Sequence, residues 1–394
     1  MKKIIVAALL LIAVPATVTA QKFQTVLNEI VQSNPELKAL AASHGAEIEQ
    51  MAQENVLAGP EIEGNHKWGT RHETKYGVGI SQRFDWPGSY RARSKARTAA
   101  EKAMLQLQLS TVLDKTVEAK LLMIQYVTTG EKLKLMLDAK GNMDRLLTLY
   151  ERGFKAGEES ILDVNKLKIE QLRMARDVAQ LEDTRDNVLQ MLLSMAGGAP
   201  VAAGLKELTV ADIPQEPVGS EEYYEGLIDQ SPAMAYYRSM DESMVQNKRV
   251  ARMAGMPSFA VGYELEREDG QYFNGISVSI EMPSWSNKHR KASAEYARLE
   301  NELNMNSARL ASVMKMRSLR ASALRAQSQC QQFASVLGEL NQQELLMKAL
   351  KGGQISLLQY LQEMDYFLEA SADYLETLNN AAQLSAELNK YNLQ

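Results

Sequence analysis

The sequence repeats one junction at two places that lie half a chain apart. From Tyr76 to Arg97 an alternating strand pattern ends at a Pro-Gly pair and a basic helix pattern begins, and the stretch from Tyr272 to Lys291 follows the same course. The two stretches align at a separation of about 196 residues, which pairs Tyr76 with Tyr272, Ile80 with Ile276, Phe84 with Ile280 and Pro87 with Pro283. We therefore expect the 394 residues to build one architecture twice rather than several unrelated domains.

A β-hairpin is predicted before each junction. Apolar and polar residues alternate on both sides of a polar turn at residues 69–75, and again on both sides of a turn at residues 267–271. An alternation of period two is typical of strands, and each predicted strand has roughly eight to eleven residues. The chain thus offers four strands, with apolar side chains gathered on one face of each.

Long helices are predicted after each junction. Beyond Ser89 the apolar positions recur at alternating steps of three and four residues, which is the pattern of a coiled-coil seam. At a rise of about 1.5 Å per residue, roughly 60 such residues span about 90 Å, more than a globular domain requires. Glycines break the pattern before each return. The predicted helices cover residues 89–152 and 160–196 in the first half and 285–351 and 356–390 in the second.

The order of these elements suggests the domain organisation. Shorter helices open at Asn34-Pro35 and at Ser231-Pro232, each with an N-cap residue before a proline. Lys2 and Lys3 precede a short apolar run, and small residues follow it, which predicts a signal peptide with a mature chain from Gln21. The expected parts are a signal peptide (1–20), a first repeat (21–196), an equatorial linker (197–230) and a second repeat (231–394).

Composition narrows the possible functions. The formal net charge of -5 gives no reason to expect nucleic-acid binding. Cys330 is the only cysteine, which excludes a disulfide within the chain and a cysteine-based zinc cluster. The abundant methionines favour flexible core packing over a soft-metal relay, and the four histidines form no pair at ligand spacing. No nucleophile motif or phosphate loop is present, so we expect no metal, no cofactor and no enzyme activity.

The strands indicate association between copies. No stretch after Gln21 has 18 or more consecutive apolar residues, so insertion into a membrane would have to use strands. Four strands cannot close a barrel, and open edges in lipid would leave backbone groups unpaired. Trp68 lies at the turn end of a hairpin, whereas Trp86 and Trp285 lie at the helix end, as interfacial residues of a barrel would. The alternative places these tryptophans in an ordinary core.

Several segments together resemble the TolC-like outer-membrane efflux factors. They are the duplicated helix starts at Asn34 and Ser231, the hairpin ends ISQRFDWPG and ISVSIEMPS, and the helical turns RGFKAGEESILDV and LKGGQISLLQY. The resemblance covers essentially the whole mature chain. It implies a mainly α fold with a small β part, in which duplicated helical hairpins form a coiled-coil tunnel and two β-hairpins contribute four strands to a trimeric 12-stranded outer-membrane β-barrel.

The same resemblance implies that the two helical turns are tips that dock a periplasmic adaptor. Glycines there let backbones approach closely, and helix ends leave free carbonyl and amide groups. The alternative is a pair of ordinary turns without a partner. The expected docking residues are Gly153, Phe154, Ala156, Gly157 and Ser160, with Leu350, Gly352, Gly353, Ser356 and Leu357.

A tunnel gate is implied just beyond the tips. In the family, acidic residues narrow the closed mouth there; this chain has Asp163 in the first half but glutamines in the second, so a complete acidic ring is not expected. The acidic residues of the first half could instead be solvated charges near a helix N-terminus. The candidate entrance residues are Glu158, Glu159, Asp163, Gln359 and Gln362.

The junction itself is expected at the membrane interface. Basic residues at a helix start oppose the helix dipole, so another interaction must favour them. Lipid phosphates and pairs between subunits, with acidic residues such as Glu101 and Glu295, are both open explanations. The residues assigned to this interface are Trp68, Trp86, Pro87, Gly88, Arg91, Arg93, Pro283 and Trp285.

The resemblance implies a function as the outer-membrane exit duct of a tripartite efflux system, with the helical part in the periplasm. Such a homotrimer passively conducts substrates that an inner-membrane pump, of the RND type, delivers through the adaptor. Two alternatives remain open at this point. One is a duct for type I protein or peptide secretion, and the other is a periplasmic coiled-coil scaffold without a pore.

Overall fold

The computed structural model describes residues 18–69, 74–268, 270–282, 287–337 and 342–393. The chain divides into two compact units. We call Ala39–Ser110 with Ile228–Ala311 the sheet unit, and Met1–Lys38, Thr111–Leu227 and Ser312–Gln394 the tip unit. Among the described residues, no helix has both the length and the hydropathy that a membrane-spanning helix needs. The expected signal peptide ends at residue 20 and lies almost entirely outside the described residues.

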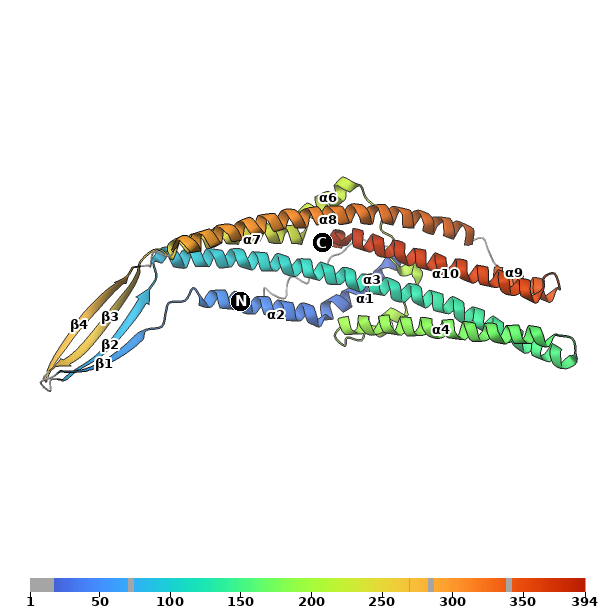
Figure 1. The fold of residues 1–394 in the computed structure, drawn as a ribbon, viewed down its shortest axis with the longest axis horizontal. Coiled ribbons are helices and arrows are strands. Elements are labelled where there is room, and N and C mark those ends of the chain that lie inside the picture. Colours follow the sequence, from blue (N-terminus) through green and yellow to red (C-terminus); the bar gives the residue numbers. More distant parts are fainter. Residues whose placement is uncertain (1–17, 70–73, 269, 283–286, 338–341, 394) are drawn as a thin grey trace. The chain divides into compact units, whose positions relative to one another are not determined.

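The sheet unit carries one antiparallel sheet of four strands, which lie side by side in the order β1-β2-β3-β4 (Figure 1). The strands are β1 (Glu61–Trp68), β2 (Thr74–Phe84), β3 (Ser258–Glu268) and β4 (Gln271–Glu281). Strands β1 and β2 form the first predicted hairpin and β3 and β4 the second, and β2 pairs with β3. The hairpins of the two sequence repeats thus form a single sheet, and both hairpin predictions are confirmed.

One face of this sheet is apolar and exposed. Alternate residues of a strand point to the same face, so the residues that oppose each other across the strands form rows. Exposed apolar side chains of this face include Ile62, Val78, Ile80, Phe84, Val261, Tyr263, Leu265, Ile276, Val278 and Ile280. The opposite face carries charged residues that pair with each other, such as Lys75 with Glu266 (Nζ to Oε2, 2.7 Å) and Arg83 with Glu281 (3.5 Å).

Four helices contribute to the sheet unit. They are α2 (Pro35–Gln53), α7 (Pro232–Met253) and the first parts of α3 (Pro87–Ala156) and α8 (Asn287–Leu337). Small side chains on α3 are buried here, including Ala92, Ala96, Ala100 and Ala103, which lets neighbouring helices approach closely. The predicted caps are present: Asn34 Oδ1 accepts from Leu37 N–H at 3.1 Å, and Ser231 Oγ accepts from Met234 N–H at 3.3 Å.

The tip unit is helical. It contains α1 (Val18–Ser33), the rest of α3, α4 (Ile161–Met195), α5 (Ala202–Lys206), η2 (Val210–Asp212), α6 (Glu221–Gln230), the rest of α8, α9 (Gln342–Lys351), α10 (Leu357–Leu388) and η3 (Lys390–Leu393). The predicted helical hairpin of the first repeat is present as α3 and α4. In the second repeat, the helix predicted over residues 285–351 is described as α8 and α9, and residues 338–341 lie outside the description.

Helix α1 was missing from the sequence prediction and holds much of the tip unit's core. Phe23, Leu27 and Ile30 are fully buried on one of its faces. They pack with residues of α3 and α4 such as Met123 and Leu192. The predicted seam of α3 is buried only in its middle part, because Leu105 and Leu137 at its ends are exposed. Most of the predicted α4 seam is buried, as expected.

Candidate functional site

The tip between α3 and α4 is closed by a glycine at the helix end. Gly157 has φ +80°, a conformation that residues other than glycine rarely adopt. Its N–H donates to Phe154 O at 3.0 Å, and Glu158 N–H donates to Gly153 O at 2.9 Å, which is the Schellman pattern. Ser160 then caps α4, with its hydroxyl accepting from Leu162 N–H at 3.1 Å. The turn is therefore fixed by local hydrogen bonds alone.

The tip between α9 and α10 has the same construction. Gly353 has φ +67° and its N–H donates to Leu350 O at 3.0 Å, while Gln354 N–H donates to Ala349 O at 2.9 Å. Ser356 caps α10 in a capping box, because its hydroxyl accepts from Gln359 N–H and its own N–H donates to Gln359 Oε1 at 2.9 Å. The glycine and serine of each tip are equally spaced in both repeats.

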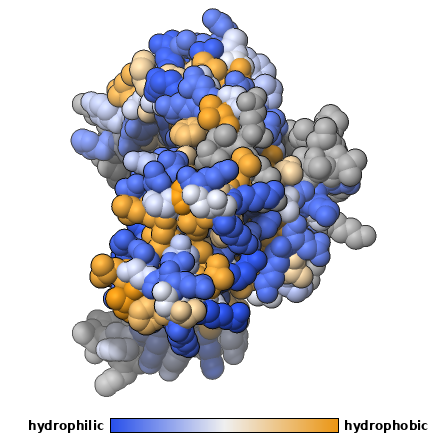
Figure 2. Space-filling view, turned by 90° about the vertical axis from the view of Figure 1, so that its right-hand side faces the viewer, coloured by the Kyte–Doolittle hydropathy of each residue, from blue (hydrophilic) through white to orange (hydrophobic). Residues whose placement is uncertain are grey.

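The predicted docking residues divide into exposed and buried ones. Phe154, Ala156, Gly157, Gly352 and Gly353 are exposed, as are both cap serines. In contrast, Leu357 is buried and Leu350 is partly buried against the core. Figure 2 views the molecule from the side on which Figure 1 shows the tips, and hydrophobic residues are interspersed there with hydrophilic ones. Exposed apolar residues beside the two glycines are Phe154, Ile161, Leu162 and Leu358.

A shared core lies behind the tips. It joins residues from α3 and α4, such as Met143 and Leu167, to residues of α10, such as Tyr360 and Met364. Leu346, Leu350 and other residues of α9 pack against it. The two hairpins of the tip unit are thus packed against one another rather than standing apart.

The predicted gate residues are not gathered into one cluster. Asp163 pairs with Lys166 on its own helix (Oδ1 to Nζ, 3.1 Å), and Gln359 is engaged in the capping box. Glu158 and Gln362 are exposed, whereas Glu159 is partly buried against Gly153. These contacts are local. A side chain that connects the two hairpins electrostatically lies nearly three turns further along α4 than Asp163.

That connection is the pairing of Arg173 on α4 with Asp365 on α10. Arg173 also pairs with Glu170 (Nη2 to Oε1, 2.8 Å). Burial raises the pKa of Glu170; Arg173 opposes this shift, and the negative charge of Asp365 adds to it. Sequence reasoning missed this cluster because the partners lie on separate helices in different repeats and carry no spacing signal.

The comparisons with known proteins give the family. The model of the family described as outer membrane efflux protein matches residues 26–198. This match covers less than half of the chain and lies almost entirely in its first half. The resemblance stated from the sequence is thereby confirmed. A comparison with curated protein sequences finds no match.

Solved structures share the fold of this chain over nearly its whole length. A membrane protein from Pseudomonas aeruginosa is 12% identical and has a TM-score of 0.77, covering 95% of this chain and 92% of that chain. VceC, an outer membrane protein of Vibrio cholerae, is 14% identical, with a TM-score of 0.70, over 94% and 96%. The open MtrE outer membrane channel of Neisseria gonorrhoeae is 16% identical, with a TM-score of 0.69, over 94% and 88%. The predicted fold class is confirmed.

The junction residues of the first repeat lie where strand β2 meets α3. Pro87 is the first residue of α3, and Trp86 before it lies against Phe259 of β3, with ring centroids 5.9 Å apart. A Cβ on Gly88 would come within 3.1 Å of Met253 Sδ, so a larger residue there would require the Met253 side chain to shift slightly. Pro283 and Trp285 lie outside the described residues.

The basic residues after the junction have partners within the same chain. Arg93 pairs with Asp85 and donates to Glu54 O at 3.2 Å. Arg97 pairs with Glu101 (Nε to Oε1, 3.3 Å), and Glu295 pairs with Lys248. Both carboxylates therefore have a basic partner within this chain. Arg91 is exposed. Local pairing therefore accounts for two of the basic residues that oppose the helix dipole.

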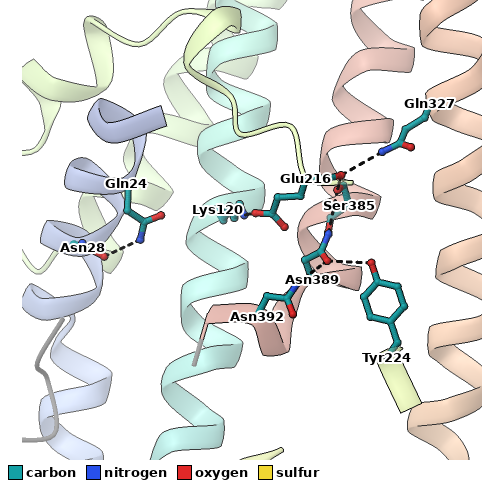
Figure 3. Close-up of polar contacts among 9 residues, drawn as sticks. All are labelled: Gln24, Asn28, Lys120, Glu216, Tyr224, Gln327, Ser385, Asn389 and Asn392. Carbon is teal, nitrogen blue, oxygen red and sulfur yellow. Dashed lines mark hydrogen bonds and ion pairs between the residues drawn. The ribbon is translucent and has the colours of Figure 1, made fainter. Parts of the chain in front are cut away.

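A polar cluster in the tip unit ties the segment after η2 to three long helices, α3, α8 and α10 (Figure 3). Lys120 on α3 is only 3% exposed and pairs with Glu216. The backbone oxygen of Glu216 accepts from Ser385 Oγ at 3.1 Å and from Gln327 Nε2 at 3.4 Å. Tyr224 OH donates to Asn389 at 3.0 Å. The segment predicted as an equatorial linker is thus fixed by specific hydrogen bonds.

Among the described residues, no group of three histidine, cysteine, aspartate or glutamate side chains is arranged to hold a metal ion. Cys330 is partly buried, which raises the pKa of its thiol. His44 is buried in a pocket of the sheet unit that Met51, Met104 and Met240 also line.

Proposed function

We propose that this protein is the outer-membrane exit duct of a tripartite efflux system. The observation that carries the proposal is the exposed apolar face of the four-stranded sheet. A soluble protein rarely leaves so large an apolar surface uncovered, whereas lipid covers it without cost. The match of residues 26–198 to the outer membrane efflux protein family supports the same proposal.

The sheet edges support assembly as a homotrimer. Within the described residues, β1 pairs only with β2 and β4 only with β3. In lipid, each edge must pair with a strand of another copy, because unpaired backbone groups are costly there. Three copies would supply the twelve strands of a closed barrel, and the helices would extend from it into the periplasm.

The tips support the choice of partner. The two glycine turns have the same construction, and each lies beside an exposed apolar residue. They therefore offer two similar surfaces to the hairpin of a periplasmic adaptor. An inner-membrane pump of the RND type would then deliver the substrate, and the duct would conduct it passively. Asp163, Glu158 and Glu159 would line the entrance on one hairpin only.

Planar-bilayer recording tests the duct. The purified protein should give discrete conductance steps, and Gly157→Val with Gly353→Val should raise the open fraction, because valine at positive φ strains both turns. Gly141→Ala, a change inside α3, is the matched control and should leave conductance unchanged. A protein that inserts into the bilayer without conducting, even with both valines, would be a scaffold.

Crosslinking in intact cells tests the docking surface. Cysteines at Gly157 or Gly353, in a Cys330→Ser background, should form links to an adaptor. Gly270→Cys is the matched control, because Gly270 also has a positive φ (+86°) but lies in the turn of the sheet. Links between copies of this chain alone would contradict docking at the tips.

A further inference from the structure

One row of side chains crosses all four strands next to the hairpin turns. His66 on β1 lies opposite Tyr76 on β2, Tyr76 lies opposite Arg267 on β3, and Arg267 lies opposite Tyr272 on β4. Opposed residues project from the same face of a sheet. The row therefore presents an imidazole, a phenol, a guanidinium and a second phenol on the apolar face, and we call it the turn row.

The members of the turn row contact each other. The rings of His66 and Tyr76 stack with centroids 4.4 Å apart and planes within 8°. Trp68 lies edge-on to His66 at 5.4 Å, and Arg267 Cζ lies 5.4 Å from the centre of the Tyr272 ring. These contacts place each basic group beside an aromatic ring and fix its position on the face.

The basic groups of the turn row are free to meet an anion. Glu266 and Glu268, the neighbours of Arg267, project to the opposite face, where both pair with Lys75. In the part of the chain that the structure describes, neither His66 nor Arg267 has an acidic partner. All four side chains of the turn row are exposed, as is Trp68.

The position of the turn row along the strands matches a membrane interface. From Phe259, at the helix end of β3, to Arg267 the strand advances by about 26 Å, at about 3.3 Å per residue. A tilt of 35–45° reduces this to about 20 Å of membrane depth, close to the roughly 25 Å apolar band of outer-membrane barrels. Exposed apolar residues occupy most positions of the rows between, with Gln82 and Asn274 as polar exceptions. The turn row thus lies where lipid headgroups begin.

We propose that the turn row binds the phosphate of a lipid headgroup. This inference rests on the proposed placement of the sheet in the outer membrane. The Arg267 guanidinium matches a phosphate with paired N–H donors, and a ring N–H of His66 supplies a further donor. Tyr76, Tyr272 and Trp68 lie along the apolar part of the same lipid, as amphipathic rings do at interfaces.

The turn row and the apolar rows next to it together favour a lipid phosphate over free phosphate. One guanidinium and one imidazole on an open face bind a small anion weakly in water, because the anion remains fully hydrated. A lipid adds apolar contact with the rows below, which holds its phosphate beside the cations. Each cation near a charged membrane surface contributes about 1 kcal/mol, or roughly a fivefold change in binding.

The test compares two lipids that differ only in the phosphate. The full-length protein, purified in detergent, is mixed with phosphatidic acid or with diacylglycerol of the same chains, and bound lipid is counted by native mass spectrometry. The wild-type protein should retain phosphatidic acid preferentially. The double variant His66→Gln with Arg267→Gln should lose at least about fivefold in retention, the effect of removing the Arg267 charge.

Two variants control for charge and folding. Arg83→Gln removes an arginine from the opposite face of the same sheet and should retain phosphatidic acid as the wild type does. Arg267→Lys keeps the charge without the planar fork and should retain an intermediate amount. Equal retention by the double variant, equal retention of diacylglycerol by the wild type, or displacement of phosphatidic acid by inorganic phosphate would each overturn the inference.

Flotation with phosphatidylcholine vesicles separates this inference from the proposed function. A wild-type protein that floats with the vesicles but shows no preference for phosphatidic acid would refute the headgroup site alone. A protein that does not associate with the vesicles at all would refute the membrane placement and, with it, the headgroup site.

Discussion

The two helical tips share a backbone but differ in what holds them. Each has a glycine with positive φ followed three residues later by a capping serine. The residue after that serine is Ile161 in the first tip, which is 46% exposed, and Leu357 in the second, which is 7% exposed. The first tip also carries acidic residues, whereas the second has glutamines and a complete capping box. The two turns thus share a backbone geometry but differ in the side-chain contacts that hold them.

This difference suggests a division of roles between the tips. The second tip is anchored by a buried leucine and by reciprocal capping bonds, so we expect it to be the more rigid of the two. The first tip leaves Phe154, Ile161 and Leu162 exposed and is therefore better suited to contact a partner. The predictions below test this contrast, beginning with the largest expected effect.

Shortening the two equivalent apolar residues should have very different effects. Leu357→Ala should destabilise the protein by about 2–5 kcal/mol, because it removes buried atoms from a packed core. Ile161→Ala should cost less than about 1 kcal/mol, since its side chain is half exposed. Chemical unfolding in detergent followed by circular dichroism measures both, and Leu357→Met is the volume-conserving control. Similar losses for the two alanines would show that the tips are supported equally.

The glycines should respond alike. Gly157→Ala and Gly353→Ala should each cost about 1–2 kcal/mol, because alanine is disfavoured at positive φ. A Cβ at either position would meet no atom within 4 Å, so the cost comes from the backbone alone. Gly141→Ala, within α3, should instead stabilise by up to about 1 kcal/mol. A large difference between the two tip glycines would show that one turn is held by contacts beyond its own backbone.

The capping serines should differ slightly. Ser356→Ala should cost about 1 kcal/mol, because it disrupts a reciprocal pair of bonds, and Ser160→Ala nearer about 0.5 kcal/mol. Thermal unfolding of both alanine variants, with Ser356→Thr and Ser160→Thr as controls that keep the hydroxyl, measures the difference. A greater loss from Ser160→Ala would reverse the assignment of the more rigid tip.

The smallest effect concerns pH and the link between the hairpins. Burial raises the pKa of Glu170 in the folded protein, so the folded state binds a proton more tightly than the unfolded state. The resulting stability is present below the unfolded pKa and is lost as pH rises through the folded pKa. Glu170→Gln should therefore flatten this part of the stability profile in urea titrations at several pH values. An unchanged profile would show that Glu170 does not titrate differently on folding.

The Arg173 and Asp365 pair provides the link between α4 and α10. Arg173 contacts Asp365 as well as Glu170, so loss of the Glu170 charge leaves it a partner on α10. Asp365→Asn should weaken the packing of α10 on α4 at every pH, which hydrogen exchange of α10 would report. This prediction would be wrong if the Asp365→Asn variant lost hydrogen-exchange protection of α10 only at pH values at which Glu170 is ionised.

Local patterns were sufficient to predict most of the elements. The strands follow period two, the glycine and serine of each tip mark where helices end and begin, and Asn34 and Ser231 cap their helices as expected. Helix α1 was missed although Phe23, Leu27 and Ile30 recur at helical spacing, a signal that could have indicated it. The exposed ends of the α3 seam show that periodicity identifies a helix face without identifying what covers it.

The sequence by itself determined the duplicated junction, the turn chemistry of the tips and the family resemblance, because each depends on residues that are neighbours along the chain. Only the tertiary structure decided that β2 pairs with β3, that Leu357 is buried while Ile161 is not, and that Arg173 meets Asp365. It also placed His66, Tyr76, Arg267 and Tyr272 in one row. These depend on strand register and helix packing between distant segments, for which no local pattern carries a signal.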